Sequence, residues 1–290
     1  MSKDSITPSG TSGPPESLWG GEPLVGEGEI FGERTQGRGS SLFLGRFTMA
    51  EVLAVLEKKG FLKESRKRGF WPLVYSIDSS AYPLQRFQVF VREKSPELEM
   101  VDLKIREGRF DPRGRTLPGF PQGLLRTLNF EWLTLQNPGA EFAGKRGALP
   151  GQLRPGLGMS KRIMDVLGFL GKRMHQDALL AFPAFYHNAV LFSRYFHFVN
   201  PDKEGEIQAI RRSFLSMSIK QLAWIVHLGC LRAGDGAVYE WRAEEQMLPL
   251  RSEIQDYFGS RAYRDRVREV QRSLRFEVDW ERYEEKAQED

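Results

Sequence analysis

Gly156 and Gly158 lie in a loop directly before a stretch in which Ile163, Leu167 and Leu170 recur at helical spacing. The first amides of a helix have no acceptor within the helix, and together with the helix dipole they attract phosphate groups. Glycine leaves room for such a group and tolerates a left-handed backbone. The pattern therefore predicts a phosphate or diphosphate site at this loop, although a plain turn before a helix is the alternative.

The backbone donors of this predicted site are the amides at the glycine turn. They belong to Gly156, Leu157, Gly158 and Met159, and Arg154, Ser160 and Lys161 add charge or a hydroxyl. Pro155 removes one further amide from the loop.

The surrounding elements alternate between strands and helices. Residues 87–91 and 101–105 have period-two patterning on either side of a turn, which predicts an antiparallel hairpin. A further strand is expected over 128–135, followed by the glycine loop and its helix. A short apolar strand over 178–182 and a helix over 188–196 complete the unit.

This order of elements resembles the GNAT-type N-acetyltransferase superfamily. The family loop has the pattern Gln/Arg-x-x-Gly-x-Gly/Ala, and Gly156 and Gly158 match its two small positions. Its first position falls on Leu153, which departs from the pattern, although Gln152 and Arg154 flank it. The resemblance covers roughly residues 49–200.

The resemblance implies binding of acetyl-CoA or another acyl-CoA. In the family, pantetheine pairs with a splayed strand, for which the candidate is 128–135. This places a carbonyl-binding backbone amide between Leu133 and Leu135. The implied reaction is direct attack of an amine on the thioester. Glu131 is the candidate general base, and Tyr186 and Tyr195 are the candidate proton donors, because the family's tyrosine position falls on Ser193.

Each of these residues also has a purely structural interpretation. Glu131 fits a solvated strand position, and Tyr186 and Tyr195 fit core or rim aromatics. Two other functions therefore stay open. One is a non-catalytic GNAT-like protein that binds CoA or a peptide. The other is an interaction scaffold that uses its basic surface. Turnover, CoA binding and salt-sensitive binding separate the three.

The charge balance and the cysteine content limit which classes of partner and cofactor the protein is expected to bind. The chain has 42 basic and 38 acidic residues, a net charge of +4, which is too small for a dedicated nucleic-acid-binding protein. We expect a small-molecule or peptide amine as acceptor, and neither a nucleic acid nor a membrane as partner. The single cysteine, Cys230, and the absence of close metal-ligand spacing among the histidines argue against a metal site. A cytoplasmic location is expected.

Three regions follow from composition. Residues 1–48 are rich in glycine, serine and proline and predict a flexible lead-in, with Leu42, Phe43, Leu44 and Phe47 docking at its end. Residues 49–202 form the GNAT-like core. Residues 203–290 form a helical C-terminal extension with a long helix through 207–225, a basic helix over 261–275 and an acidic tail. The predicted fold class is α+β, with a mixed, mostly antiparallel sheet.

Overall fold

A computed structural model describes residues 42–142 and 147–289 of the protein. The elements in chain order are α2 (Met49–Lys58), α3 (Phe61–Lys67), β1 (Leu73–Asp78), β2 (Gln85–Val91), the 3₁₀ helix η1 (Pro96–Leu98), β3 (Glu99–Phe110), β4 (Leu125–Leu135), α4 (Ser160–Arg173), β5 (Ala178–Ala181), α5 (Tyr186–Phe192), β6 (His197–Phe198), α6 (Pro201–Ser213), α7 (Ile219–His227), β7 (Leu231–Ala233), β8 (Gln246–Pro249), α8 (Ser252–Gly259), α9 (Arg261–Ser273), β9 (Phe276–Val278) and α10 (Trp280–Glu289).

Within these residues, seven strands form one sheet in the order β1-β2-β3-β4-β5-β8-β6, and β7 pairs separately with β9. The sheet is antiparallel except for β4 and β5, which are parallel and are joined through α4. The predicted α+β class with a mixed, mostly antiparallel sheet is confirmed. The parallel pair requires a crossover between its strands, and this crossover carries the glycine loop to the start of α4.

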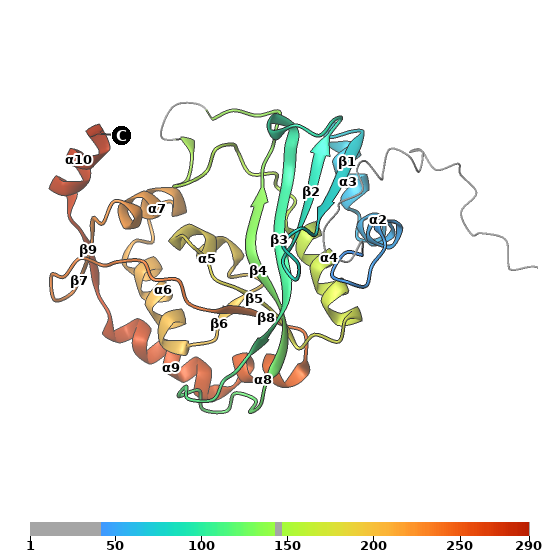
Figure 1. The fold of residues 1–290 in the computed structure, drawn as a ribbon. Helices are drawn as coiled ribbons and strands as arrows, with labels where there is room; N and C mark the ends of the chain where they lie inside the picture. The colour runs from blue at the N-terminus through green and yellow to red at the C-terminus, as the bar shows by residue number, and fades with distance from the viewer. Residues whose placement is uncertain (1–41, 143–146, 290) are drawn as a thin grey trace, which may run out of the picture. The chain divides into compact units, whose positions relative to one another are not determined.

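Helices α2, α3 and α4 cover one side of the first strands, whereas α5, α6 and α7 lie on the other side of β4 (Figure 1). The α2–α4 side buries what we call the first core, which includes Val52, Phe61, Leu103, Ile163 and Leu167. The spacing of Ile163 and Leu167 along α4 brings both side chains to one helix face, as the sequence predicted.

Helix α2 begins where the sequence indicated. The Thr48 hydroxyl accepts a hydrogen bond from the amide of Glu51, and the Glu51 carboxylate accepts one from the amide of Thr48, which is a capping box. Just before it, Phe43, Leu44 and Phe47 are buried against the first core, so the predicted docking of these three residues is confirmed, whereas Leu42 is only half-buried. The predicted flexible lead-in otherwise falls on residues 1–41, which lie outside the described residues.

The region after residue 202 is mostly helical, as expected, but it differs from the prediction in two ways. The expected long helix over 207–225 is two helices, because Ser218 caps a new helix with a reciprocal hydrogen bond to Gln221. The region also supplies β8, which lies between β5 and β6 in the main sheet. The seven-stranded sheet is therefore completed only by residues of the predicted extension.

The second core lies among α5, α6 and α7 and includes Tyr186, Val190, Ile207, Leu222 and Phe276. The predicted basic helix over 261–275 is present as α9, and it packs along α6. In the part of the chain that the structure describes, every helix is too short or too polar to cross a membrane.

Candidate functional site

Strands β4 and β5 pair over a short length and then part. The parallel register runs from Thr127 opposite Ala178 to Phe130 opposite Ala181, whereas β4 continues to Leu135. At this point β4 carries a bulge. Lys104 and Ile105 of β3 face Trp132 and Phe130, which leaves Glu131 as the extra residue. A bulge bends a strand and increases its twist, so the bulge accounts for the divergence of the two strands.

The backbone of Leu133 faces the side on which β5 has ended. The amide of Gln136 donates to the carbonyl of Met100 in β3 at 3.1 Å, so Gln136 faces β3. Successive residues of a strand point their peptide groups to opposite edges. Leu133 and Leu135 therefore face away from β3. The carbonyl of Leu135 already accepts a hydrogen bond from the amide of Leu157 at 3.1 Å. We call the opening between β4 and β5, beyond Phe130 and Ala181, the fork. Leu133 is consequently the residue whose amide and carbonyl both face the fork.

The glycine loop returns along the end of β4. The amide of Asn137 donates to the carbonyl of Pro155 at 2.7 Å, and Gln136 and Gly156 form an isolated antiparallel bridge. Pro155 fits here because only its carbonyl is used. Gly158 then turns the chain toward α4 with a φ of 70°, a left-handed conformation that favours glycine. The turn that starts α4 is thereby fastened to the strand that forms the fork.

The predicted amide donors separate into two groups. The amide of Leu157 is used by Leu135, so its prediction as a free donor is wrong: the loop pairs with β4 instead of standing clear of it. The amides of Gly156, Gly158, Met159 and Ser160 have no acceptor among the described residues. The amide of Gly156 belongs to the residue bridged to Gln136 and lies before the turn. The last three are consecutive at the N-terminus of α4, and no side chain caps that end.

Arg68, the C-cap residue directly after α3, reaches this turn from a distant part of the sequence. Its Nη1 donates to the carbonyl of Leu157 at 3.0 Å, and its Nε donates to Glu64 at 2.7 Å. This ion pair holds the pKa of Glu64 below its usual range. A Cβ built on Gly158 would lie 2.8 Å from Nη1 of Arg68. Arg68 lies at the end of a visibly basic run that includes Lys67, but nothing in the sequence connects this run with the glycine turn.

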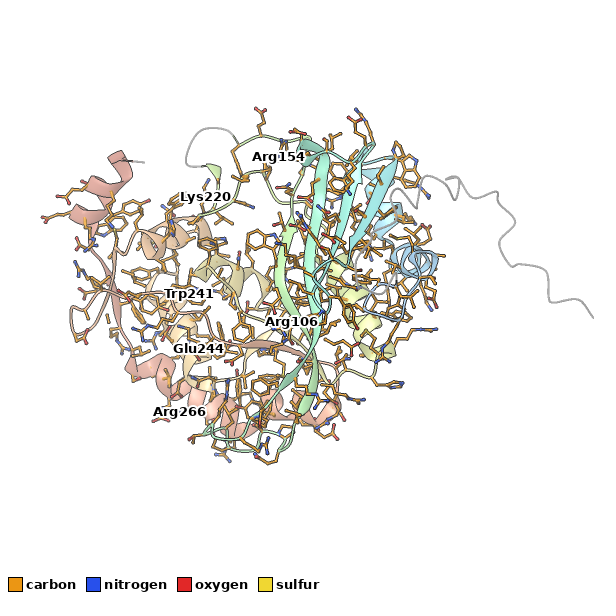
Figure 2. All side chains as sticks on the ribbon, viewed as in Figure 1. Arg106, Arg154, Lys220, Trp241, Glu244 and Arg266 are labelled. Atoms are coloured by element: carbon orange, nitrogen blue, oxygen red, sulfur yellow. The ribbon has the colours of Figure 1, made fainter. Side chains whose placement is uncertain are left out.

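Arg154, which was predicted to add charge to the site, is engaged elsewhere in the loop. Its Nη1 donates to the carbonyl of Pro138 at 2.8 Å. Figure 2 shows Arg154 near one end of the long strands and Arg106 nearer their middle. Arg154 therefore joins the two ends of the loop, and Arg68 is the arginine that contacts the glycine turn.

The three candidate catalytic residues have different surroundings. Glu131 is exposed at the bulge, and its carboxylate accepts a hydrogen bond from Nε of Arg106 at 2.6 Å. Tyr186 is 2% exposed within the second core, and its hydroxyl has no partner among the described residues. Burial raises the pKa of Tyr186. Tyr195 packs at the edge of the first core, and the centre of its ring lies 5.7 Å from Cζ of Arg194. None of the contacts in the described residues joins these three side chains.

Tyr195 opens onto a cleft of about 660 Å³ beside α4. The cleft is lined by three basic residues, Lys59, Lys172 and Arg194, and by one carboxylate, Asp165. Phe169 and Phe258 contribute apolar surface. The ammonium groups of Lys58 and Lys59 lie 5.4 and 4.8 Å from the centre of the Phe169 ring. Of the two candidate tyrosines, Tyr195 is therefore the one that is half-buried and lines an open cleft.

The start of α5 carries a histidine that the sequence analysis left without a role. The His187 ring is buried and stacks on Phe185 with ring centres 5.3 Å apart. Burial, helped by the charge of His227, lowers the pKa of His187 to about 4. Phe185 also packs against the glycine loop, because a Cβ on Gly151 would lie 2.9 Å from its ring. His187 is therefore a neutral imidazole next to the residue that supports the loop.

Possible metal ligands do not gather in the described part of the chain. Within residues 42–142 and 147–289, no three His, Cys, Asp or Glu side chains lie close enough together to hold a metal ion. Cys230 is buried, and burial raises the pKa of its thiol. This thiol has the character of a packing group.

Comparisons of the chain with protein-family models, with curated proteins and with solved structures each returned no match. The geometry of the fork and of the glycine turn is therefore the basis for a function.

Proposed function

We propose that the protein is an acyl-CoA-dependent N-acyltransferase of the GNAT type, which transfers an acyl group directly to an amine. The observation that carries this proposal is the combination of a forked sheet and a free helix start. The fork opens at Glu131, the peptide of Leu133 faces it, and the free amides of Gly158, Met159 and Ser160 begin the helix that connects the two strands of the fork.

The order of elements supports the same proposal. An antiparallel meander leads into the long strand β4, and the glycine loop, α4 and the parallel strand β5 follow. This is the order that the sequence resemblance to GNAT-type N-acetyltransferases implies. The bulge at Glu131 adds a physical reason for the splayed strand that such proteins use to bind pantetheine.

In the proposed binding mode, the diphosphate of acetyl-CoA or another acyl-CoA lies on the amides of Gly158, Met159 and Ser160. Arg68 adds a guanidinium next to these amides, and charge-assisted hydrogen bonds to phosphate are roughly twice as strong as neutral ones. The pantetheine amides pair with the peptide of Leu133 in place of the missing β5 neighbour. In this mode the carbonyl of Leu135 is unavailable to the ligand, because it accepts a hydrogen bond from the amide of Leu157.

The proposed reaction is the attack of an amine nitrogen on the thioester carbonyl carbon. A C–N bond forms, the C–S bond breaks, one proton leaves the amine and one is taken up by the departing CoA thiolate. Glu131 is the proposed base, the amide of Leu133 the proposed carbonyl donor, and Tyr195 the proposed proton donor. Tyr186 is the weaker candidate, because its phenol is enclosed in the second core.

A non-catalytic CoA-binding protein is the second candidate function. It is favoured by the separation of Glu131, Tyr186 and Tyr195, which no contact in the described residues brings together. Such a protein keeps the diphosphate site and loses turnover. The cytoplasm is the proposed location for both functions, since the single cysteine of the chain is a free, buried thiol.

Titration with free CoA and acetyl-CoA tests the binding step. We expect saturable heat in isothermal titration calorimetry and a raised melting temperature with both compounds, since a ligand that binds only the folded state stabilises it. Adenosine diphosphate is the matched control for the pantetheine arm and should bind more weakly. No binding of either CoA species at about 1 mM would exclude both candidate functions.

A turnover assay then distinguishes the acyltransferase from the non-catalytic CoA-binding protein. The protein is incubated with acetyl-CoA and a panel of small amines and lysine peptides, and acylated amine is measured by mass spectrometry. Product that falls about 100-fold in Tyr195→Phe supports the proposed proton donor. Product formation that is equal in the wild type and in Tyr195→Phe would reject this donor. CoA binding without any product would favour the non-catalytic protein.

A further inference from the structure

Helices α5, α6, α7 and α9 border a second cleft of about 780 Å³, which we call the arginine cleft. Its apolar lining includes Val190, Ile207, Leu222, Phe214 and Met217, and it also contains four arginines, Arg211, Arg212, Arg264 and Arg268. This combination of apolar surface and a few charged groups within 300–1,000 Å³ is typical of a small-molecule site.

The positive charge of the arginine cleft is only partly neutralised. Arg268 pairs with Asp265 at 3.0 Å, and Arg212 donates to the carbonyl of Leu274 at 3.1 Å. Arg211 has no hydrogen bond or ion pair with any described residue. The one acidic residue in the lining, Glu204, is engaged by the amide of Phe198 and by Gln208. The cleft therefore has cations available for an anion.

Tyr186 provides a second, independent observation. It lines the arginine cleft and is only 2% exposed, and its hydroxyl makes no hydrogen bond to any described residue. A buried polar group without a partner costs free energy, so a native protein normally supplies a partner or binds one. The positive charge of Arg211 also acts on this hydroxyl.

We propose that the arginine cleft binds a small organic anion that has an apolar chain, with its carboxylate or phosphate held by Arg211 and by the hydroxyl of Tyr186. The apolar chain lies along Phe214, Met217 and Leu222. Leu215, which is 85% exposed, lies at the rim and extends this apolar surface. The Tyr186 hydroxyl has almost no accessible surface of its own in the structure, so the proposed head group reaches it through a shift of the Tyr186 side chain, and Arg211 is the group that is open to the anion from the start.

This site is distinct from the proposed acyl-CoA site. Val190 and Tyr186 face the second core and the arginine cleft, whereas Phe192, farther along α5, packs against the first core. Trp241, whose ring lies edge-on to Tyr186 with centres 5.9 Å apart, is placed among these helices in Figure 2. The inference does not depend on acyl transfer, and it assigns the Tyr186 hydroxyl to ligand binding.

Calorimetric titration of the full chain with decanoate tests the proposal, with decylamine as the matched cation. We expect saturable decanoate binding and at least tenfold weaker decylamine binding. Arg211→Gln should weaken decanoate binding about 10-fold and Tyr186→Phe about 5-fold. Arg113→Gln is the control and should bind as the wild type does, since Arg113 pairs with Asp111 and does not line the cleft.

Melting temperatures measured without decanoate distinguish a ligand role from a structural one. Tyr186→Phe removes a hydroxyl that has no partner in the described chain, so its melting temperature should equal or exceed that of the wild type. Unchanged stability with weakened decanoate binding supports the proposal. Three results would overturn it: no saturable decanoate binding at about 1 mM, equal affinity for decylamine, or decanoate affinity unaffected by both substitutions.

Discussion

Arg68 and Gly158 depend on each other across the helix-start turn. Gly158 has a φ of 70°, and the space that a side chain would occupy there is taken by Nη1 of Arg68, 2.8 Å from an ideal Cβ. The same nitrogen donates to the carbonyl of Leu157 at 3.0 Å. The glycine thus permits both the left-handed turn and the approach of a cation to the free amides of α4.

Gly158→Ala tests this dependence. The left-handed backbone should cost about 1–2 kcal/mol of unfolding free energy, measured by urea denaturation. Displacement of the Arg68 side chain should also lower CoA affinity about 10-fold. Gly236→Ala is the matched control, because Gly236 has a φ of 83° and open space around it. It should cost about 1 kcal/mol and leave CoA affinity unchanged. Equal CoA affinity in both variants would contradict the proposed diphosphate position.

Arg68→Gln should weaken CoA binding about 5- to 10-fold with little change in stability. The Arg68–Glu64 pair is partly exposed, so its loss should change the stability of the protein little. Arg66→Gln removes the same charge from the same helix, but Arg66 lies over the Trp71 ring, 4.2 Å from its centre. A similar loss of affinity in Arg66→Gln would show that only the general positive potential matters. Calorimetric titration with CoA at two salt concentrations measures the affinities of both variants.

Two helical glycines should respond to alanine in opposite directions. A Cβ on Gly205 in α6 would lie 2.7 Å from Cβ of Val270 and 2.8 Å from the carbonyl of Val267, both in α9. Gly205→Ala must push α9 away and should cost about 1–3 kcal/mol. Gly168 in α4 has no atom within 4 Å of its ideal Cβ, so Gly168→Ala should stabilise by about 0.5–1 kcal/mol. A denaturation midpoint of Gly205→Ala equal to or above that of the wild type would refute the close packing of α6 and α9.

The sequence could predict the parts of the site that depend on neighbouring residues. The spacing of Ile163 and Leu167 defined the buried face of α4, and the glycines before it indicated the turn. Period-two patterning predicted the hairpin of β2 and β3. These features follow from local backbone geometry and from which side chains can be buried together.

The remaining features depend on contacts between distant residues. Arg68 meets Leu157 from another helix, and nothing in the local sequence of either residue indicates the other. The bulge at Glu131 arises from the register against β3, which a single strand does not specify. The use of the Leu157 amide by Leu135 likewise depends on the loop returning to β4. For the same reason, β8 was not anticipated as a member of the sheet.

His187 should make the protein less stable as the pH falls from 6.5 toward 4. Its folded pKa is about 4, below the ordinary value of 6.5, so in this range the unfolded chain binds a proton that the folded chain does not. Stability from this group is present above pH 6.5 and is lost as the pH falls. Between pH 7 and pH 5 the unfolding free energy should drop by about 1–2 kcal/mol more in the wild type than in His187→Gln. His175→Asn changes an exposed histidine and should retain the full drop. Urea denaturation at pH 7 and pH 5 measures the unfolding free energy. An equal drop between the two pH values in the wild type and in His187→Gln would show that His187 is not held neutral.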